Sequence, residues 1–147
     1  MTTKKRKREG SRRRNLMLRV SSPLSKEVEE LVHTTIGCCL TVHRALGPGL
    51  FETIYSRAVA LELRENGISF EREKPYPVLY RGELLCEQRL DFVVEGQIVL
   101  ELKAIERLAS VHHAQLLTYL RVSRLRVGLL MNFNVAVLRD GLVRKVL

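Results

Sequence analysis

The sequence lacks the segments that mark membrane and secreted proteins. No apolar run approaches the roughly 20 residues of a transmembrane helix, and the first residues contain no apolar segment of a signal peptide. Three cysteines, with Cys38 next to Cys39 and Cys86 far away, give neither an even disulfide framework nor a Cys-x-x-Cys metal spacing. We therefore expect a soluble cytoplasmic protein that makes no membrane contact and buries its cysteines as small apolar residues.

Net positive charge is also scarce outside one segment. The chain has a formal charge of +9, of which +8 lies in residues 1–19, where nine Lys or Arg face the single acid Glu9. The rest of the chain is nearly neutral, so composition reveals no basic face on the folded part. We interpret residues 1–22 as a basic arm and residues 23–147 as one domain.

The basic arm has too little apolar surface to offset the entropy of ordering, so we expect it to be disordered when free. It would bind nucleic-acid phosphates by counterion release. The alternative is a solubilising tail or a start-site extension. The residues expected to contact phosphates are Lys4, Lys5, Arg6, Lys7, Arg8, Arg12, Arg13 and Arg14.

The pattern of apolar residues predicts one mixed α/β unit, with helices flanking a central sheet. Helical spacing follows the expected N-cap Ser22-Pro23 up to Gly47. The other expected elements are a helix at 50–66 with Gly67 as its C-terminal cap residue, β-rich runs at 68–73, 76–80, 84–94 and 98–104, a helix at 110–122, a strand at 126–133 and a final hairpin around Asp140-Gly141.

The segment 89–104 contains two alternating strands around a glycine turn. The apolar residues of the two strands must share a face, which excludes a two-residue loop. They are Leu90, Phe92 and Val94 on the first strand and Ile98, Leu100, Leu102 and Ala104 on the second. A three-residue loop at 95–97 satisfies this parity, and it pairs Val94 with Ile98, Asp91 with Glu101 and Arg89 with Lys103.

This register brings two carboxylates face to face. Opposed β-carbons lie about 4.5 to 5.5 Å apart, and two anions there repel each other unless a cation lies between them. Mg²⁺ fits, because it takes oxygen ligands from one or two carboxylates, water and substrate phosphate. Lys103 lies on the same face and would stabilise developing negative charge, so Asp91, Glu101 and Lys103 indicate phosphodiester hydrolysis.

A sheet with one solvated face is the alternative, with these charges forming ordinary cross-strand ion pairs. The third expected helix favours a site, since Gln115 and Tyr119 lie on one stripe with His112 and Leu116. Gln115 could position water or phosphate, and Tyr119 could bind a phosphate or stack on a base, although both could be interfacial polar residues. We interpret His112 and His113 as structural.

Asp91 and Glu101-Leu102-Lys103 resemble the core motif of the PD-(D/E)XK nuclease superfamily, although Leu90 stands where the superfamily name has Pro. The segment 115–119 resembles the Gln-x-x-x-Tyr element of its RecB-like members, and Gly49, Glu52 and Tyr55 match the GxxExxY family. The resemblance implies a restriction-endonuclease-like αβββαβ core after an N-terminal helix. It also implies Mg²⁺, with Mn²⁺ as a substitute, on Asp91 and Glu101, with Lys103 assisting the attacking water.

In related nucleases a Glu of the first core helix adds to the metal shell, which makes Glu52 a candidate ligand, with Tyr55 one turn along the same face. A carboxylate at a helix start is also favoured by the helix dipole alone. DNA is the expected substrate, with RNA and the oligomeric state left open.

Three functions follow from these residues. The first is a metal-dependent nuclease that uses Asp91, Glu101, Lys103, Gln115 and Tyr119. The second is a non-catalytic nucleic-acid-binding or accessory module on a nuclease fold, and the third is a structural or protein-interaction domain.

Overall fold

The structure is a computed structural model that describes residues 22–147. The predictions for the basic arm, including its eight phosphate-binding residues, lie outside the described residues. The elements follow the order α2, α3, β1, β2, β3, α4, β4, a 3-10 turn and β5. From α3 to β4 this is the predicted αβββαβ order, with α2 as the predicted preceding helix.

The first two elements of the described residues are helices. Helix α2 spans Lys26–Leu46 and is capped by Ser25, whose side chain accepts a hydrogen bond from Val28 N, so the predicted cap at Ser22 is wrong by three residues. Helix α3 spans Glu52–Glu65. Its end confirms the predicted role of Gly67, because Gly67 N donates to Arg64 O and Ile68 N donates to Leu63 O, the paired bonds of a Schellman cap.

Five strands form one sheet in the order β1-β2-β3-β4-β5. Strands β3 and β4 are parallel and joined through α4 (Ser110–Ser123), whereas the other neighbours are antiparallel. The strands are β1 at Phe70–Tyr80, β2 at Glu83–Val94, β3 at Ile98–Lys103, β4 at Val127–Asn132 and β5 at Leu142–Val146.

Two predictions about strands are wrong. The runs at 68–73 and 76–80 are a single strand, because β1 is an edge strand, where Pro75 and Pro77 cost no ladder hydrogen bond to a further neighbour. The final hairpin is not a tight turn at Asp140-Gly141. Strand β4 reaches β5 through a longer connection that ends in the 3-10 turn Leu138–Gly141.

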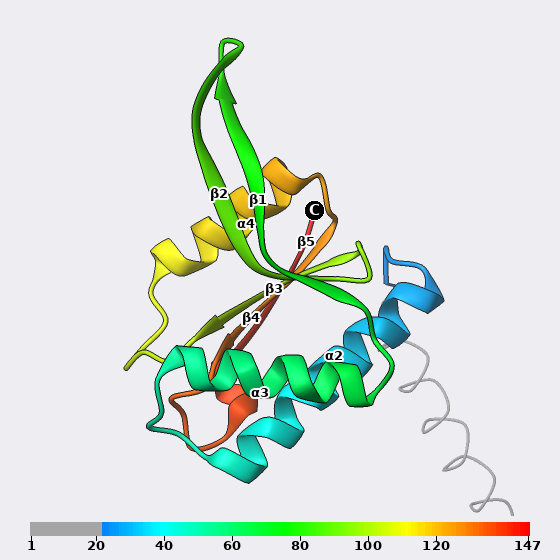
Figure 1. Cartoon of the computed structure of the whole chain (residues 1–147), viewed down its shortest axis with the longest axis vertical. Helices are drawn as coiled ribbons and strands as arrows, with labels where there is room; N and C mark the ends of the chain where they lie inside the picture. Colours follow the sequence, from blue (N-terminus) through cyan, green and yellow to red (C-terminus); the bar gives the residue numbers. More distant parts are fainter. Residues whose placement is uncertain (1–21) are drawn as a thin grey trace, which may run out of the picture.

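Two apolar layers enclose the sheet, with α2 and α3 on one side and α4 on the other (Figure 1). Phe92, Val94, Ile98, Leu100 and Leu102 pack toward α2 and α3, as the shared-face prediction requires. Leu90 was predicted to join them, but it packs on the α4 side. The β1–β2 ladder explains this difference, because it has no pair between Glu73 and Asp91. Glu73 has a φ of 50° there, and the strands change direction.

Helix α4 packs very closely on the inner strand β4. A Cβ at Gly128 would lie 2.7 Å from Leu116 Cδ1, so a larger residue there would require the Leu116 side chain to shift. The cysteine prediction holds for Cys38 and Cys39, which are buried, and is wrong for Cys86, which is exposed on the β1–β2 hairpin. That hairpin projects well beyond the rest of the fold (Figure 1). None of the helices described between residues 22 and 147 has the length and apolar character needed to cross a membrane.

Candidate active site

Strands β2 and β3 part where the two predicted acids lie. The ladder runs through Val94–Ile98, Val93–Val99 and Phe92–Leu100, which confirms the predicted three-residue loop and register. At the next position the backbone amides donate to side-chain carboxylates of the opposite strand, not to its backbone carbonyl groups. Asp91 N donates to Glu101 Oε1 at 2.9 Å, and Leu102 N donates to Asp91 Oδ2 at 2.9 Å.

The two carboxylates are therefore each tied to the backbone of the opposite strand. The predicted pair Arg89–Lys103 does not form, because the β2–β3 ladder ends at Phe92 and Arg89 pairs with Pro75 of β1 instead. Glu101 is 4% exposed. Burial, followed by the negative charge of Asp91, raises the pKa of Glu101 to about 9, although Lys103 acts in the opposite direction.

Lys103 is held at the end of β3 by its main chain. It pairs with Asn132 in the parallel ladder, and Phe133 N donates to Lys103 O at 2.8 Å. The buried side chain of Asn132 then holds the following segment, because its amide donates to Ile105 O at 2.9 Å and its oxygen accepts from Ile105 N at 3.1 Å. We call Asp91, Glu101 and Lys103 the sheet wall.

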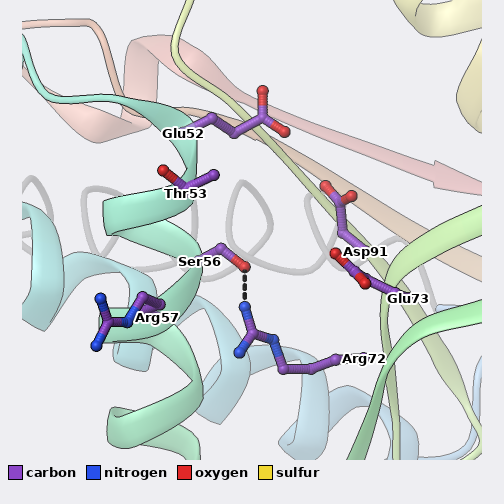
Figure 2. A pocket seen from close by; sticks show the side chains of 7 residues that line it. All are labelled: Glu52, Thr53, Ser56, Arg57, Arg72, Glu73 and Asp91. Atoms are coloured by element: carbon purple, nitrogen blue, oxygen red, sulfur yellow. Dashed lines mark hydrogen bonds between the residues drawn. The ribbon is translucent and has the colours of Figure 1, made fainter.

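Glu52 reaches the same site from α3. It lines a pocket of about 380 Å³ together with Thr53, Ser56 and Arg57 of α3, Arg72 and Glu73 of β1 and Asp91. Figure 2 shows the Glu52 carboxylate directed toward Asp91 across this pocket. Burial and then the charge of Asp91 raise the pKa of Glu52, and Lys103 lowers it. We call the α3 residues Glu52, Thr53, Ser56 and Arg57 the helix wall.

The loop before α3 explains the spacing of Gly49, Glu52 and Tyr55. Gly49 has a φ of 100°, a conformation that side chains disfavour. Tyr55 is fully buried, and its hydroxyl donates to Gly47 O at 2.5 Å and accepts from Leu50 N at 3.1 Å. Its ring stacks on Phe133 at 4.6 Å. Tyr55 therefore points into the core and fixes the loop, whereas Glu52 faces the pocket. The prediction that the two side chains share one helix face is wrong.

On the opposite side, α4 brings Tyr119 to the acids. Tyr119 packs against the α4-side core, and its hydroxyl accepts a long hydrogen bond of 3.4 Å from Gln88 Nε2. Burial, followed by the charges of Glu101 and Asp91, raises the pKa of Tyr119. Gln115 is exposed one turn earlier, with no hydrogen bond to another described residue. His112 has the predicted structural role, since its Nδ1 accepts from Ala109 N at 2.8 Å at the start of α4.

Sequence reasoning missed five of the seven pocket residues, namely Thr53, Ser56, Arg57, Arg72 and Glu73. Ser56 follows Glu52 by one helical turn, and this spacing could have placed it on the same wall. Arg72 and Glu73 come from β1, an edge strand whose facing could not be derived without the change of direction at Glu73.

The residues present fit a hard divalent cation. Among residues 22–147, no group of three or more His, Cys, Asp and Glu side chains lies close enough to hold a metal ion. Asp91 and Glu101 supply two carboxylates, and each uses one oxygen for a backbone amide of the opposite strand. Mg²⁺ commonly takes one or two carboxylates and completes its six ligands with water and phosphate.

Fold and site together define a class: mixed α/β proteins in which two carboxylates and a lysine meet where two central strands part. A sequence model of the PD-(D/E)XK nuclease superfamily matches residues 29–145, and the chain belongs to this superfamily. No curated protein and no solved structure matches the chain. The family match supports a nuclease-type function with a nucleic-acid substrate, and nucleases of this superfamily typically use divalent metals.

Proposed function

We propose that the chain is a metal-dependent nuclease that hydrolyses phosphodiester bonds in DNA. The observation that carries this proposal is the pair formed by the half-buried Asp91 and the buried Glu101, two carboxylates held together by reciprocal backbone hydrogen bonds. Glu101 is buried beside Asp91 and its pKa is raised to about 9, so ionising it without a cation costs free energy. A divalent cation offsets this cost, and the PD-(D/E)XK membership supports the same chemistry.

Asp91 and Glu101 would hold Mg²⁺, with Mn²⁺ as a substitute. Glu52 does not form a close three-carboxylate cluster with them, so it would add to the metal shell from the helix wall through bound water. When bound, the cation holds a phosphate oxygen and makes water more acidic. The Lys103 ammonium stabilises the negative charge that develops on the phosphate during attack. Tyr119 and Gln115 hold the water or phosphate in position from α4.

The spacing of Gly49, Glu52 and Tyr55 supports a finer assignment to the GxxExxY family, because each residue of the motif has a separate physical role. The basic arm, residues 1–22, adds affinity for nucleic acid through phosphate contacts. A cytoplasmic location is part of the same proposal.

The test is cleavage of labelled single- and double-stranded DNA by the full chain in Mg²⁺ or Mn²⁺. The comparison variants are Glu101→Ala and Glu106→Ala, the latter an exposed glutamate just after β3. We expect cleavage by the wild type and Glu106→Ala, and its loss in Glu101→Ala and in EDTA. Absence of cleavage in every sample, with DNA binding retained, would reject the nuclease in favour of a non-catalytic binding module.

A further inference from the structure

The guanidinium of Arg72 is fixed at the pocket without an acidic partner. Its Nη2 donates to Ser56 Oγ at 2.8 Å, and its Cζ lies 5.5 Å from the centroid of the Phe92 ring. None of the ion pairs among residues 22–147 involves Arg72. A guanidinium carries five N–H donors, and the hydrogen bond to Ser56 uses only one of them.

The pocket is therefore divided by charge. Figure 2 shows the carboxylates of Glu52, Asp91 and Glu73 on one side, while the Arg72 side chain extends to Ser56 on the other. An arginine that lines the same pocket as three acids would ordinarily pair with one of them, since charge-assisted hydrogen bonds are the stronger ones. The bond to Ser56 and the Phe92 ring keep it apart from them.

We propose that Arg72 binds the phosphate of the nucleic-acid strand that neighbours the hydrolysed one. This inference rests on the proposed nuclease function of the same site. The planar guanidinium matches two phosphate oxygens, and an arginine that is already oriented loses less conformational entropy on binding. Because the acidic side receives the reacting phosphate with its cation, the cationic side is left for the next phosphate along the strand.

Arg57 lines the same pocket but differs from Arg72 in how it is held. No hydrogen bond or ion pair to another residue of 22–147 fixes its side chain, and in Figure 2 its guanidinium points away from Asp91. Arg57 therefore contributes to the positive field of the helix wall, whereas Arg72 supplies a defined phosphate contact. Ser56 is a positioning residue, because it acts on the phosphate only through Arg72.

The experiment measures binding of the full chain to a short single-stranded DNA under EDTA, so that cleavage is not required. The variants are Arg72→Gln, Arg72→Lys and Ser56→Ala, with Arg139→Gln as a charge-matched control on the 3-10 turn. We expect Arg72→Gln to weaken binding about tenfold, with a salt slope shallower by about one. Ser56→Ala should weaken it about threefold with an unchanged slope, since the charge remains.

A second series replaces single phosphates of the DNA by uncharged methylphosphonates. One position should remove the effect of Arg72→Gln, because that phosphate no longer interacts with Arg72. Equal losses in Arg72→Gln and Arg139→Gln, or an Arg72→Gln effect that no single phosphate removes, would overturn the subsite. If Arg72-dependent binding persists while the wild type does not cleave DNA in Mg²⁺, the nuclease proposal fails and the phosphate site stands.

Thermal unfolding of each variant separates lost contacts from lost folding. Arg72 is exposed on an edge strand, so Arg72→Gln should fold. Arg72→Lys provides the independent test, because it keeps the charge but not the planar donor pair. It should keep the wild-type salt slope and recover only part of the affinity, and full recovery would contradict a geometrically defined contact.

Discussion

Glu101 on the sheet wall and Glu52 on the helix wall carry the same carboxyl group in different surroundings. Glu101 is 4% exposed and accepts a backbone hydrogen bond from the neighbouring strand. Glu52 is exposed, lies at the first position of α3 and accepts no hydrogen bond from the described residues. The sheet wall therefore fixes the position of its charges, whereas the helix wall can adjust to what binds.

The largest effect should come from the sheet wall. Glu101→Gln keeps the acceptor for Asp91 N but cannot supply the carboxylate charge that a bound cation requires, so DNA cleavage should fall about 1000-fold, the loss of a cation contribution of several kcal/mol. The metal-free protein should be at least as stable as the wild type, because a neutral amide replaces a buried acid. Cleavage rates and melting temperatures with and without Mg²⁺ check both statements. A destabilised variant that still cleaves would show that Glu101 is structural.

The next largest effect is a loss of DNA affinity, which distinguishes the basic arm from the two walls. Deleting residues 1–22 should reduce affinity for DNA about 100-fold at low salt and flatten its salt dependence by several units, because the arm's phosphate contacts are lost. Cleavage at saturating DNA should remain, since the walls are intact. Binding measured over a range of salt concentrations checks this, and an unchanged slope would refute a role for the arm.

A smaller loss of activity is expected on the helix wall. Glu52→Gln should reduce cleavage about tenfold, the size expected when a residue supports the metal rather than holding it alone. Glu65→Gln, at the exposed last position of the same helix, is the matched control and should retain activity. If Glu52→Gln removed activity as fully as Glu101→Gln, the distinction between the two walls would be wrong.

The position of the helix wall depends on Tyr55. Tyr55→Phe removes a buried hydroxyl with two backbone partners and should lower the free energy of unfolding by about 1 to 2 kcal/mol. Urea unfolding measures this loss. Tyr80→Phe, at an exposed tyrosine of the β1–β2 hairpin, should leave stability unchanged.

The smallest expected effect is a change in stability at Glu29 of α2, away from both walls. Hydrogen bonds from Arg144 and then Ser22 lower the pKa of Glu29 to about 2. An acid with a lowered pKa stabilises the fold above its ordinary value of 4.5, and this contribution is lost as the pH falls toward 2. Both side chains are about one third exposed, so solvent screening limits the contribution to at most about 1 kcal/mol.

Glu29→Gln should therefore lower the melting temperature slightly at pH 7 and not at pH 2. Glu27→Gln, in the same helical turn, is the control. A difference between Glu29→Gln and the wild type that persisted unchanged at pH 2 would exclude the ionic contribution.

The local pattern of the sequence was sufficient to predict the sheet wall. Alternation along β2 and β3 excludes a two-residue loop, and the three-residue loop that satisfies it brings Asp91 to Glu101. The alternation failed at Leu90, because the chain changes direction between Glu73 and Asp91 and a repeat of two residues does not report such a change.

The helix wall required a different kind of information. Glu52 could be named only through a family resemblance, since nothing near it in the sequence indicates that α3 begins beside β2. The contact between Arg72 and Ser56 joins residues 16 positions apart through the packing of an edge strand on a helix. Such contacts depend on how elements pack, and propensity or periodicity does not encode them.

The parting of β2 and β3 leaves two backbone protons in an unusual position. The amides of Asp91 and Leu102 are bonded to carboxylate oxygens, not to the carbonyl groups of a strand. Any ligand that draws charge from these carboxylates must weaken both bonds. The two amides should therefore report occupancy of the site directly, as shifted resonances or faster hydrogen exchange in the protein alone, before any nucleic acid is added.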